Sequence, residues 1–269
     1  MKFLKSKFSV LMVFLLINLS AQSCASIDGN AEVYSSNLAD DFFIEVKLER
    51  GKYWFRIVGS EWELLKEGVQ RTGRSKEVLF VDVNDNDVKD IFVKVFEAGP
   101  NSVYALFFSE IKIGLISFVE QDELFGSPYV NEKGQMVSVK RDGPFSTLET
   151  YKGYQGRFYK FELREPINSD LDRVTIYDEG GIGKFSIKFL GASIDAFACI
   201  SVERVHLSST PSVSKKSQPY LVKGDAVSIL DVQGEGEWVK VRYSAKNIFE
   251  AWVPQNSIKL NETGHCEKE

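Results

Sequence analysis

The sequence predicts an all-β protein, with an antiparallel β-sandwich or propeller-blade-like N-terminal domain and a small C-terminal β-barrel. Short runs rich in β-branched and aromatic residues recur from about residue 42 to 202, and Gly, Pro, Asn and Asp fill the breaks between them. Aromatic residues make up 13% of the chain, which favours strands. Several runs alternate apolar and polar residues, as one-sided burial in an antiparallel sheet requires.

Residues 1–25 have the pattern of a secretory signal peptide. Lys2, Lys5 and Lys7 precede an apolar run over residues 8–19, which is too short for a membrane span, and small residues follow it. The leader predicts export, to the periplasm or to the outer membrane as a lipoprotein.

The end of this leader allows two kinds of processing. Ala21-Gln22-Ser23 before Cys24 resembles a bacterial lipoprotein site, which would leave Cys24 as the lipidated first residue. Ordinary cleavage after Ser23 or Ala25 is the alternative. Contact with a membrane is therefore expected only through a lipid anchor on Cys24.

The charge balance argues against nucleic acid as a partner. The net charge is -5, and removing the leader leaves 30 basic and 38 acidic residues, a net charge of -8. Lys and Arg occur no more densely than in pairs, so the chain lacks the basic patch that binds phosphates.

The chain divides by composition into two domains after the leader. Residues 26–40 are small and polar and are expected to form a linker, and a β-rich domain is expected over residues 41–198. The strands expected in it are residues 43–48, 53–59, 78–83, 91–96, 103–108, 114–120, 136–141, 158–163, 173–178 and 185–189. Residues 61–73 are the best helical candidate, and their helical period is weak.

An acidic loop separates two apolar strand-like runs in the stretch VLFVDVNDNDVKDIFVKV. Asp82, Asn84, Asn86 and Asp90 occupy relative positions 1, 3, 5 and 9, and the carbonyl of Val88 occupies position 7. A hard cation such as calcium takes several oxygen ligands around one point, and a tight loop turns alternate side chains inward. The spacing predicts a calcium site formed by these five residues, with a metal-free Asx-rich hairpin as the alternative.

This loop resembles the calcium loops of FG-GAP/VCBS-like β-domains, whose pattern is D-x-N-x-D-G-x-x-D followed by apolar residues. Two positions depart from it. Asn86 stands where Asp is usual, which removes a charge, and Asp87 stands where Gly makes the turn. Asp tolerates the left-handed region, so the turn is expected to survive. More loosely, residues 42–178 are similar to a family of exported bacterial proteins, some of which are periplasmic proteins that bind and inhibit cell-wall lytic enzymes such as lysozyme.

The segment 199–261 resembles a bacterial SH3 domain in the pieces PYLVKGDAVSIL, EWVKVRY and AWVPQNSIKL. The resemblance implies a five-stranded SH3-like barrel, followed by a polar tail at residues 262–269. It also implies a ligand lying over exposed aromatic side chains, either a peptidoglycan peptide or an envelope protein. The candidates for this surface are Tyr220, Trp238, Tyr243 and Trp252. A core role for Trp238 and Trp252 is the alternative.

Two cysteines bracket the SH3-like segment. Export to an oxidising compartment permits a disulfide between Cys199 and Cys266. The alternative is a buried Cys199 and a free Cys266 in the polar tail.

No catalytic constellation stands out in the sequence. The only histidines are His206 and His265, and no G-x-S-x-G, P-loop or dinucleotide motif is present. Paired carboxylates remain open as a glycosidase alternative. The sequence therefore predicts a non-enzymatic envelope protein that binds a protein or cell-wall partner, as an inhibitor or immunity-type protein against lytic enzymes. A cell-wall hydrolase anchored by the SH3-like module and a purely structural envelope protein are the alternatives.

Overall fold

The computed structural model describes residues 27–28, 31–39, 42–70, 76–212, 219–234, 237–244 and 248–266. Across these residues the protein is all-β, as predicted, and contains no α-helix. Accordingly, none of the described segments is a helix long and apolar enough to cross a membrane. The predicted signal peptide at residues 1–25, with Cys24, lies outside the described residues.

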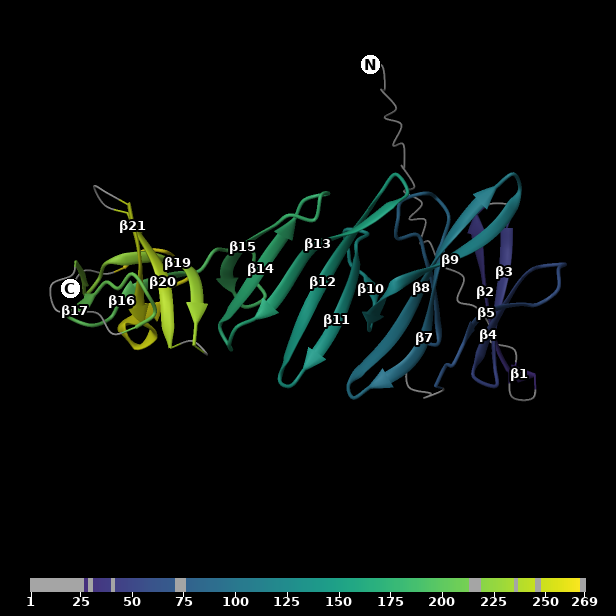
Figure 1. The fold of residues 1–269 in the computed structure, drawn as a ribbon, viewed down its shortest axis with the longest axis horizontal. Coiled ribbons are helices and arrows are strands. Elements are labelled where there is room, and N and C mark those ends of the chain that lie inside the picture. Colours follow the sequence, from purple (N-terminus) through teal and green to yellow (C-terminus); the bar gives the residue numbers. More distant parts are fainter. Residues whose placement is uncertain are drawn as a thin grey trace, which may run out of the picture.

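Three antiparallel meanders follow one another along the chain and stand in a row in Figure 1. The first contains β1 (Ile27–Asp28), β2 (Ala31–Ala39), β3 (Phe42–Glu49), β4 (Lys52–Ile57) and β5 (Glu63–Glu67). The second contains β6 (Val78–Val81), β7 (Asp90–Ala98), β8 (Asn101–Lys112) and β9 (Leu115–Gly126). The third contains β10 (Tyr129–Val130), β11 (Met136–Asp142), β12 (Phe145–Tyr154), β13 (Arg157–Pro166), β14 (Leu171–Tyr177) and β15 (Gly183–Phe189).

The second and third meanders use the same two turns in the same order. Gly99-Pro100 and Gly143-Pro144 connect the first long pair of strands, and both glycines have positive φ. Ile113-Gly114 and Gln155-Gly156 connect the next pair, with positive φ at both positions. Two residues of positive φ match the right-handed twist of the flanking strands. The two meanders thus share a hairpin plan that the residue sequence does not show as a repeat.

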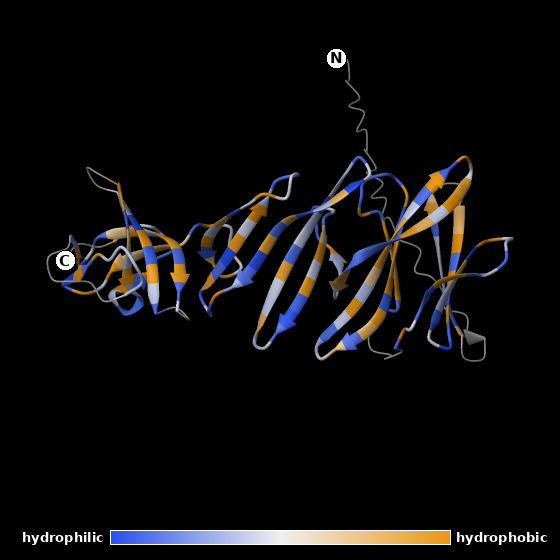
Figure 2. Ribbon diagram, in the orientation of Figure 1, coloured by the Kyte–Doolittle hydropathy of each residue, from blue (hydrophilic) through white to orange (hydrophobic). Residues whose placement is uncertain are grey.

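Two apolar cores hold the three meanders together. The first core lies between the first and second meanders and includes Ile44, Tyr53 and Ile91. The other core lies between the second and third and includes Phe92 and Tyr151. Successive residues of β7 face opposite cores, so the second meander is buried on both sides. Figure 2 shows the alternation of apolar and polar residues along the long strands.

The C-terminal module packs against the end of the third meander, at the far end of the row from β1 (Figure 1). It contains β16 (Phe197–Ile200), β17 (Arg204–His206), β18 (Tyr220–Val222), β19 (Ala226–Gln233), β20 (Trp238–Ser244), β21 (Ile248–Pro254), the 3₁₀ turn η1 (Gln255–Ser257) and β22 (Ile258–Leu260). Five strands form a sheet in the order β21-β20-β19-β16-β22, and β17 and β18 form a separate ladder. Within the described residues these strands do not close into a barrel.

Several segments differ from those expected from the sequence, and one of them is β12, which was not among the expected strands. The expected linker at residues 26–40 contains β2, whose Leu38 is buried in the first core. The weak helical candidate at residues 61–73 contains β5, which pairs with β4. β16 begins at Phe197, before the expected boundary at 199. In each case the segment has weak periodicity of its own, and pairing with a neighbouring strand determines its secondary structure.

Candidate functional site

The acidic loop between β6 and β7 lies where the three meanders meet. The backbone N–H of Lys89 donates to the carbonyl of Leu38 in β2, at 2.9 Å. The N–H of Gly156, in the β12–β13 turn, donates to the carbonyl of Asn84, also at 2.9 Å. One loop therefore contacts both neighbouring sheets through its backbone, while its ends continue into the strands of the middle sheet.

The Asp82 carboxylate organises the turn of this loop. Its Oδ1 accepts from the N–H groups of Asp85 and Asn86 at 2.9 and 3.3 Å, and its Oδ2 accepts from the N–H of Asp87 at 2.9 Å. Asp85 and Asp87 both have positive φ, at 59° and 63°. Asp87 thus adopts the left-handed conformation expected at the position where the family pattern has Gly.

Asp90 closes the loop from inside the protein. Its side chain is fully buried, Oδ2 accepts from the N–H of Val83 at 3.1 Å, and Oδ1 accepts from the N–H of Ser109 at 2.9 Å. Burial raises the pKa of Asp90 to about 7, against the lowering effect of these two hydrogen bonds, and the nearby charge of Asp82 adds to the rise. The carboxylate is held by backbone donors and lacks a neighbouring cation among the partners described.

Two side-chain amide oxygens of the loop are further candidate ligands for a cation. Asn84 is buried, and its Oδ1 atom has no hydrogen-bond partner among the described residues. Asn86 Oδ1 accepts from the N–H of Val88, whose side chain packs against the first core. No group of three or more His, Cys, Asp and Glu side chains that could hold a metal occurs in the described part of the chain. A cation here would depend on amide and carbonyl oxygens beside the two carboxylates.

The C-terminal module carries a groove with a volume of about 650 Å³. Its lining residues come from β17, from the β19–β20 connection with the start of β20, and from the end of β21 with η1. They are Arg204, Val205, His206, Glu237, Trp238, Pro254, Gln255 and Asn256. The Arg204 guanidinium also lies over the ring of the half-exposed Tyr220, 4.1 Å from its centroid. The groove therefore places a cation, a carboxylate, two amides and an indole around one space.

Of the four aromatic residues predicted for the ligand surface, two lie at the groove and two do not. Trp238 lines the groove, and Tyr220 lies beside it through Arg204 and His206. Tyr243 is five residues from Trp238 along β20 and so faces the other side, where it packs against the core. Trp252 is half-buried and is not among the lining residues. Arg204, Glu237 and Asn256 were missed, because their positions around the groove follow from strand pairing.

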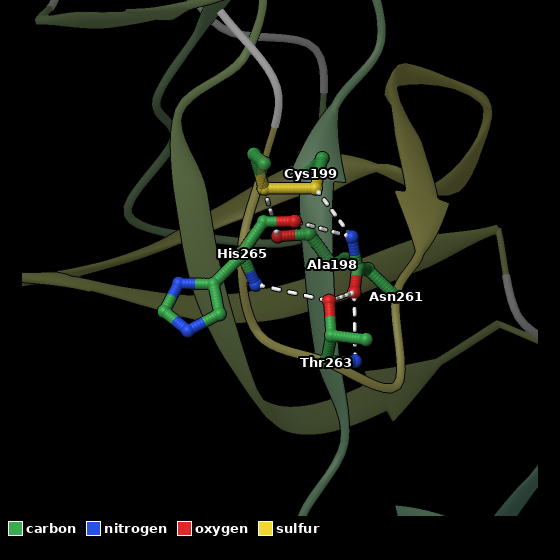
Figure 3. Close-up of a disulfide and its surroundings, with 6 residues drawn as sticks. Ala198, Cys199, Asn261, Thr263 and His265 are labelled. Carbon is green, nitrogen blue, oxygen red and sulfur yellow. Dashed lines mark hydrogen bonds between the residues drawn. A yellow bond between two sulfur atoms is a disulfide. The ribbon is translucent and has the colours of Figure 1, made fainter.

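The two cysteines that bracket the module are joined in the structure (Figure 3). Cys199 in β16 and Cys266 in the tail form a disulfide across 67 residues of sequence. Asn261 Nδ2 donates to the carbonyl of His265 at 2.7 Å, which holds the tail beside the bond. Because both cysteines are in the disulfide, neither provides a free thiol nucleophile next to His265.

A buried ion pair of the second meander, which Tyr53 of the first meander contacts, was also missed. The Lys94 side chain is fully buried, and its Nζ lies 2.8 Å from Glu77 Oε1 and 3.5 Å from Glu97 Oε1. The Tyr53 hydroxyl donates to Glu77 Oε2 at 3.1 Å, and burial with the Glu77 charge raises the pKa of Tyr53. A lysine inside the apolar run IFVKV was the available signal.

A second charged cluster joins the second and third meanders. Burial alone would raise the pKa of Glu149, but its ion pairs with Lys140 and Lys160, at 2.6 and 2.7 Å, lower it below its ordinary value. The Tyr151 hydroxyl donates to Glu123 of β9 at 2.7 Å. These contacts connect sheets, and none of these residues lines either of the two cavities found in the described part of the chain, so we assign them to structure.

Comparison of the chain with protein-family models, with curated proteins and with solved structures gives no match.

Proposed function

We propose that this chain is an exported, non-enzymatic binding protein of the bacterial envelope, and that its groove holds an extended peptide from a protein or cell-wall partner. The observation that carries the proposal is the set of groups around the groove. Arg204 suits a carboxylate, Glu237 suits an ammonium group, and Gln255 and Asn256 suit peptide amides. Trp238 supplies a flat apolar surface of the kind that anchors peptide ligands.

The arrangement of strands supports a finer proposal about architecture. We propose that the meanders are propeller-blade-like sheets, and that the C-terminal sheet with the β17–β18 ladder is an open SH3-like barrel. The ladder continues toward the sheet through backbone hydrogen bonds between Ser208 and Trp252, at 2.8 and 3.0 Å. This bridge brings Arg204 and His206 to the same groove as Trp238.

Replacing Trp238 by Ala is expected to weaken peptide binding about tenfold or more, because a buried aromatic anchor contributes at least about 2 kcal/mol. The measurement is titration calorimetry with peptidoglycan stem peptides released by muramidase digestion, together with capture of proteins from an envelope extract. Tyr129→Ala, an exposed aromatic residue of the third meander, is the matched control.

The same assays can contradict the binding proposal. If the wild type retains neither stem peptides nor a lytic enzyme, the groove is not a partner site of this kind. Steady clearing of a cell-wall suspension by the purified chain would instead support a hydrolase anchored by its SH3-like module. A loss of binding in Tyr129→Ala equal to that in Trp238→Ala would place the partner outside the groove.

We also propose that the acidic loop binds one calcium ion, which fastens the junction of the three meanders. Asp82, Asn84, Asn86, Val88 and Asp90 would supply oxygen ligands, and the ion would neutralise charge that now lies close to a buried carboxylate. The support is the buried Asn84 Oδ1, which has no partner among the described residues. The ion would act on stability and not on a reaction.

Adding 10 mM calcium is expected to raise the free energy of unfolding by about 1–3 kcal/mol, if the affinity is that of extracellular calcium modules. The measurement is thermal unfolding with calcium and with chelator. Asn84→Leu should lose the calcium response, whereas Asn131→Leu, in the β10–β11 turn, should keep it. Identical melting curves of the wild type in calcium and chelator would show that the loop is a metal-free hairpin.

A further inference from the structure

The most exposed apolar side chains of the protein lie at hairpin turns. Among the described residues, the four large apolar residues with the highest exposure are Ile113 at 102%, Leu115 at 74%, Ile248 at 70% and Ile182 at 68%. Ile113 lies in the β8–β9 turn and Ile182 in the β14–β15 turn, whereas Leu115 begins β9 and Ile248 begins β21. Scattered single apolar residues are ordinary on a surface, but these four share a structural position.

These turns lie along one edge of the elongated molecule. In a meander alternate turns fall at the same end of the sheet, so the β12–β13 and β14–β15 turns share one end of the third meander. The hydrogen bond from Gly156 to Asn84 joins that end to the acidic loop, which lies at the same end of the second meander as the β8–β9 turn. In Figure 1 these turns, with the end of β20 and the start of β21, form the upper edge, whereas the β7–β8 and β11–β12 turns form the lower one.

Ile113 is held at this edge against its backbone preference. Its φ is 53°, a left-handed conformation that a β-branched residue rarely adopts. Asn or Gly is the usual first residue of such a turn, and the corresponding positions in two other hairpins hold Arg50 and Gln155. An isoleucine that is strained and fully exposed adds nothing to the core. Figure 2 shows the apolar colour at the tip of this hairpin.

We propose that this edge docks onto the surface of a lipid bilayer, with the apolar turns entering the layer of headgroups. The apolar residues stand on separate, convex turns, and neither groove found in the described residues is lined by any of the four. A bilayer is flat and apolar beneath its headgroups, so it can accept several such turns at once, whereas a protein would need a matching pocket for each. Lys112 and Arg157 flank the turns with side chains more than three-quarters exposed.

Acidic groups at this edge neutralise its cations. We therefore expect insertion of the apolar turns, and not electrostatic attraction, to supply the free energy of docking. Lys112 pairs with Glu110, and Arg157 lies 3.9 Å from Glu179. An acyl group on Cys24 would be a separate attachment, because three residues span only about 10 Å and β1 lies toward the lower edge in Figure 1. The proposal is independent of the groove.

The test is sedimentation with vesicles of phosphatidylethanolamine and phosphatidylglycerol at a ratio of about 3:1. The protein is the full mature chain carrying Cys24→Ser, which removes the acylation site. Ile113→Asn combined with Ile182→Ser is expected to lower vesicle binding about tenfold, since each change removes an inserted apolar side chain. Ile113→Asn also places a residue that prefers the left-handed region in the turn, so folding should be kept or improved.

The matched control is Phe145→Ser combined with Leu190→Ser. Phe145 begins β12 at the lower edge, and the N–H of Leu190 donates to Asp170 in the β13–β14 connection near that edge. This control should bind vesicles like the wild type. The proposal is overturned if the wild type does not sediment with vesicles, or if both double variants lose binding equally. A wild-type dimer in solution that Ile113→Asn dissociates would assign the edge to self-association and overturn it as well.

Discussion

Replacing Lys94 by Met is expected to lower the free energy of unfolding by about 3–5 kcal/mol. The change keeps most of the side-chain volume but removes the ammonium group 2.8 Å from Glu77 Oε1. Both side chains are buried, so Glu77 would keep its charge without a neighbouring cation in a site of low dielectric constant, with the Tyr53 hydroxyl as its remaining side-chain donor. The measurement is urea unfolding followed by intrinsic fluorescence, with the midpoint and the slope both compared with those of the wild type.

Two control variants separate an uncompensated charge from lost packing. Lys94→Met with Glu77→Gln removes both charges and should recover most of the loss, because an amide can still accept from the Tyr53 hydroxyl. Lys112→Met removes an exposed lysine that pairs with Glu110, and surface pairs contribute little, so its midpoint should not move. If the single Lys94 variant is as stable as the wild type, water reaches this ion pair and it is not buried in solution.

The strands of the β-rich domain could be predicted where turn residues and alternation agreed. The segments from Val78 to Val95 and from Arg157 to Phe189 carry strong β-branched and aromatic runs, and both fold as expected. β2 could not be found in this way, because AEVYSSNLA mixes small and polar residues and becomes a strand by pairing with β3. Pairing is a property of two segments, and a single window of sequence contains only one.

The candidate sites show the same division between local and long-range information. The acidic loop is local: its turn is built by hydrogen bonds that the Asp82 carboxylate accepts from backbone N–H groups three to five positions later, so spacing alone indicated it. The groove is not local, since Arg204 and Glu237 are distant in sequence and meet only through the pairing of the C-terminal strands. The proposed docking edge could not be predicted from the sequence either, because its turns are distant in sequence and lie side by side only in the folded protein.

The acidic loop depends on a residue far from it in sequence, and Gly153→Ala is the variant that tests this. Gly153 lies in β12, and a Cβ built on it would stand 2.4 Å from the carbonyl oxygen of Val83 and 2.7 Å from Asn84 Cα. Both are backbone atoms, so no side chain can rotate away and the two sheets must separate. The expected loss is about 3 kcal/mol, at the upper end of the range for overpacking, measured by urea unfolding.

The size of the loss in the free energy of unfolding shows whether it comes from the close approach of the β12 backbone to the acidic loop or from a general cost of replacing glycine. Gly180→Ala is the matched control, because its Cβ would meet only the Asp178 carboxylate, at 3.3 Å, and the residue is exposed; its stability should stay within about 0.5 kcal/mol of the wild type. Gly153→Ala should also weaken any calcium response, because the displaced backbone belongs to Asn84. A Gly153→Ala protein with wild-type stability would mean that the third meander does not rest on the acidic loop, and the loop would then fasten two sheets and not three.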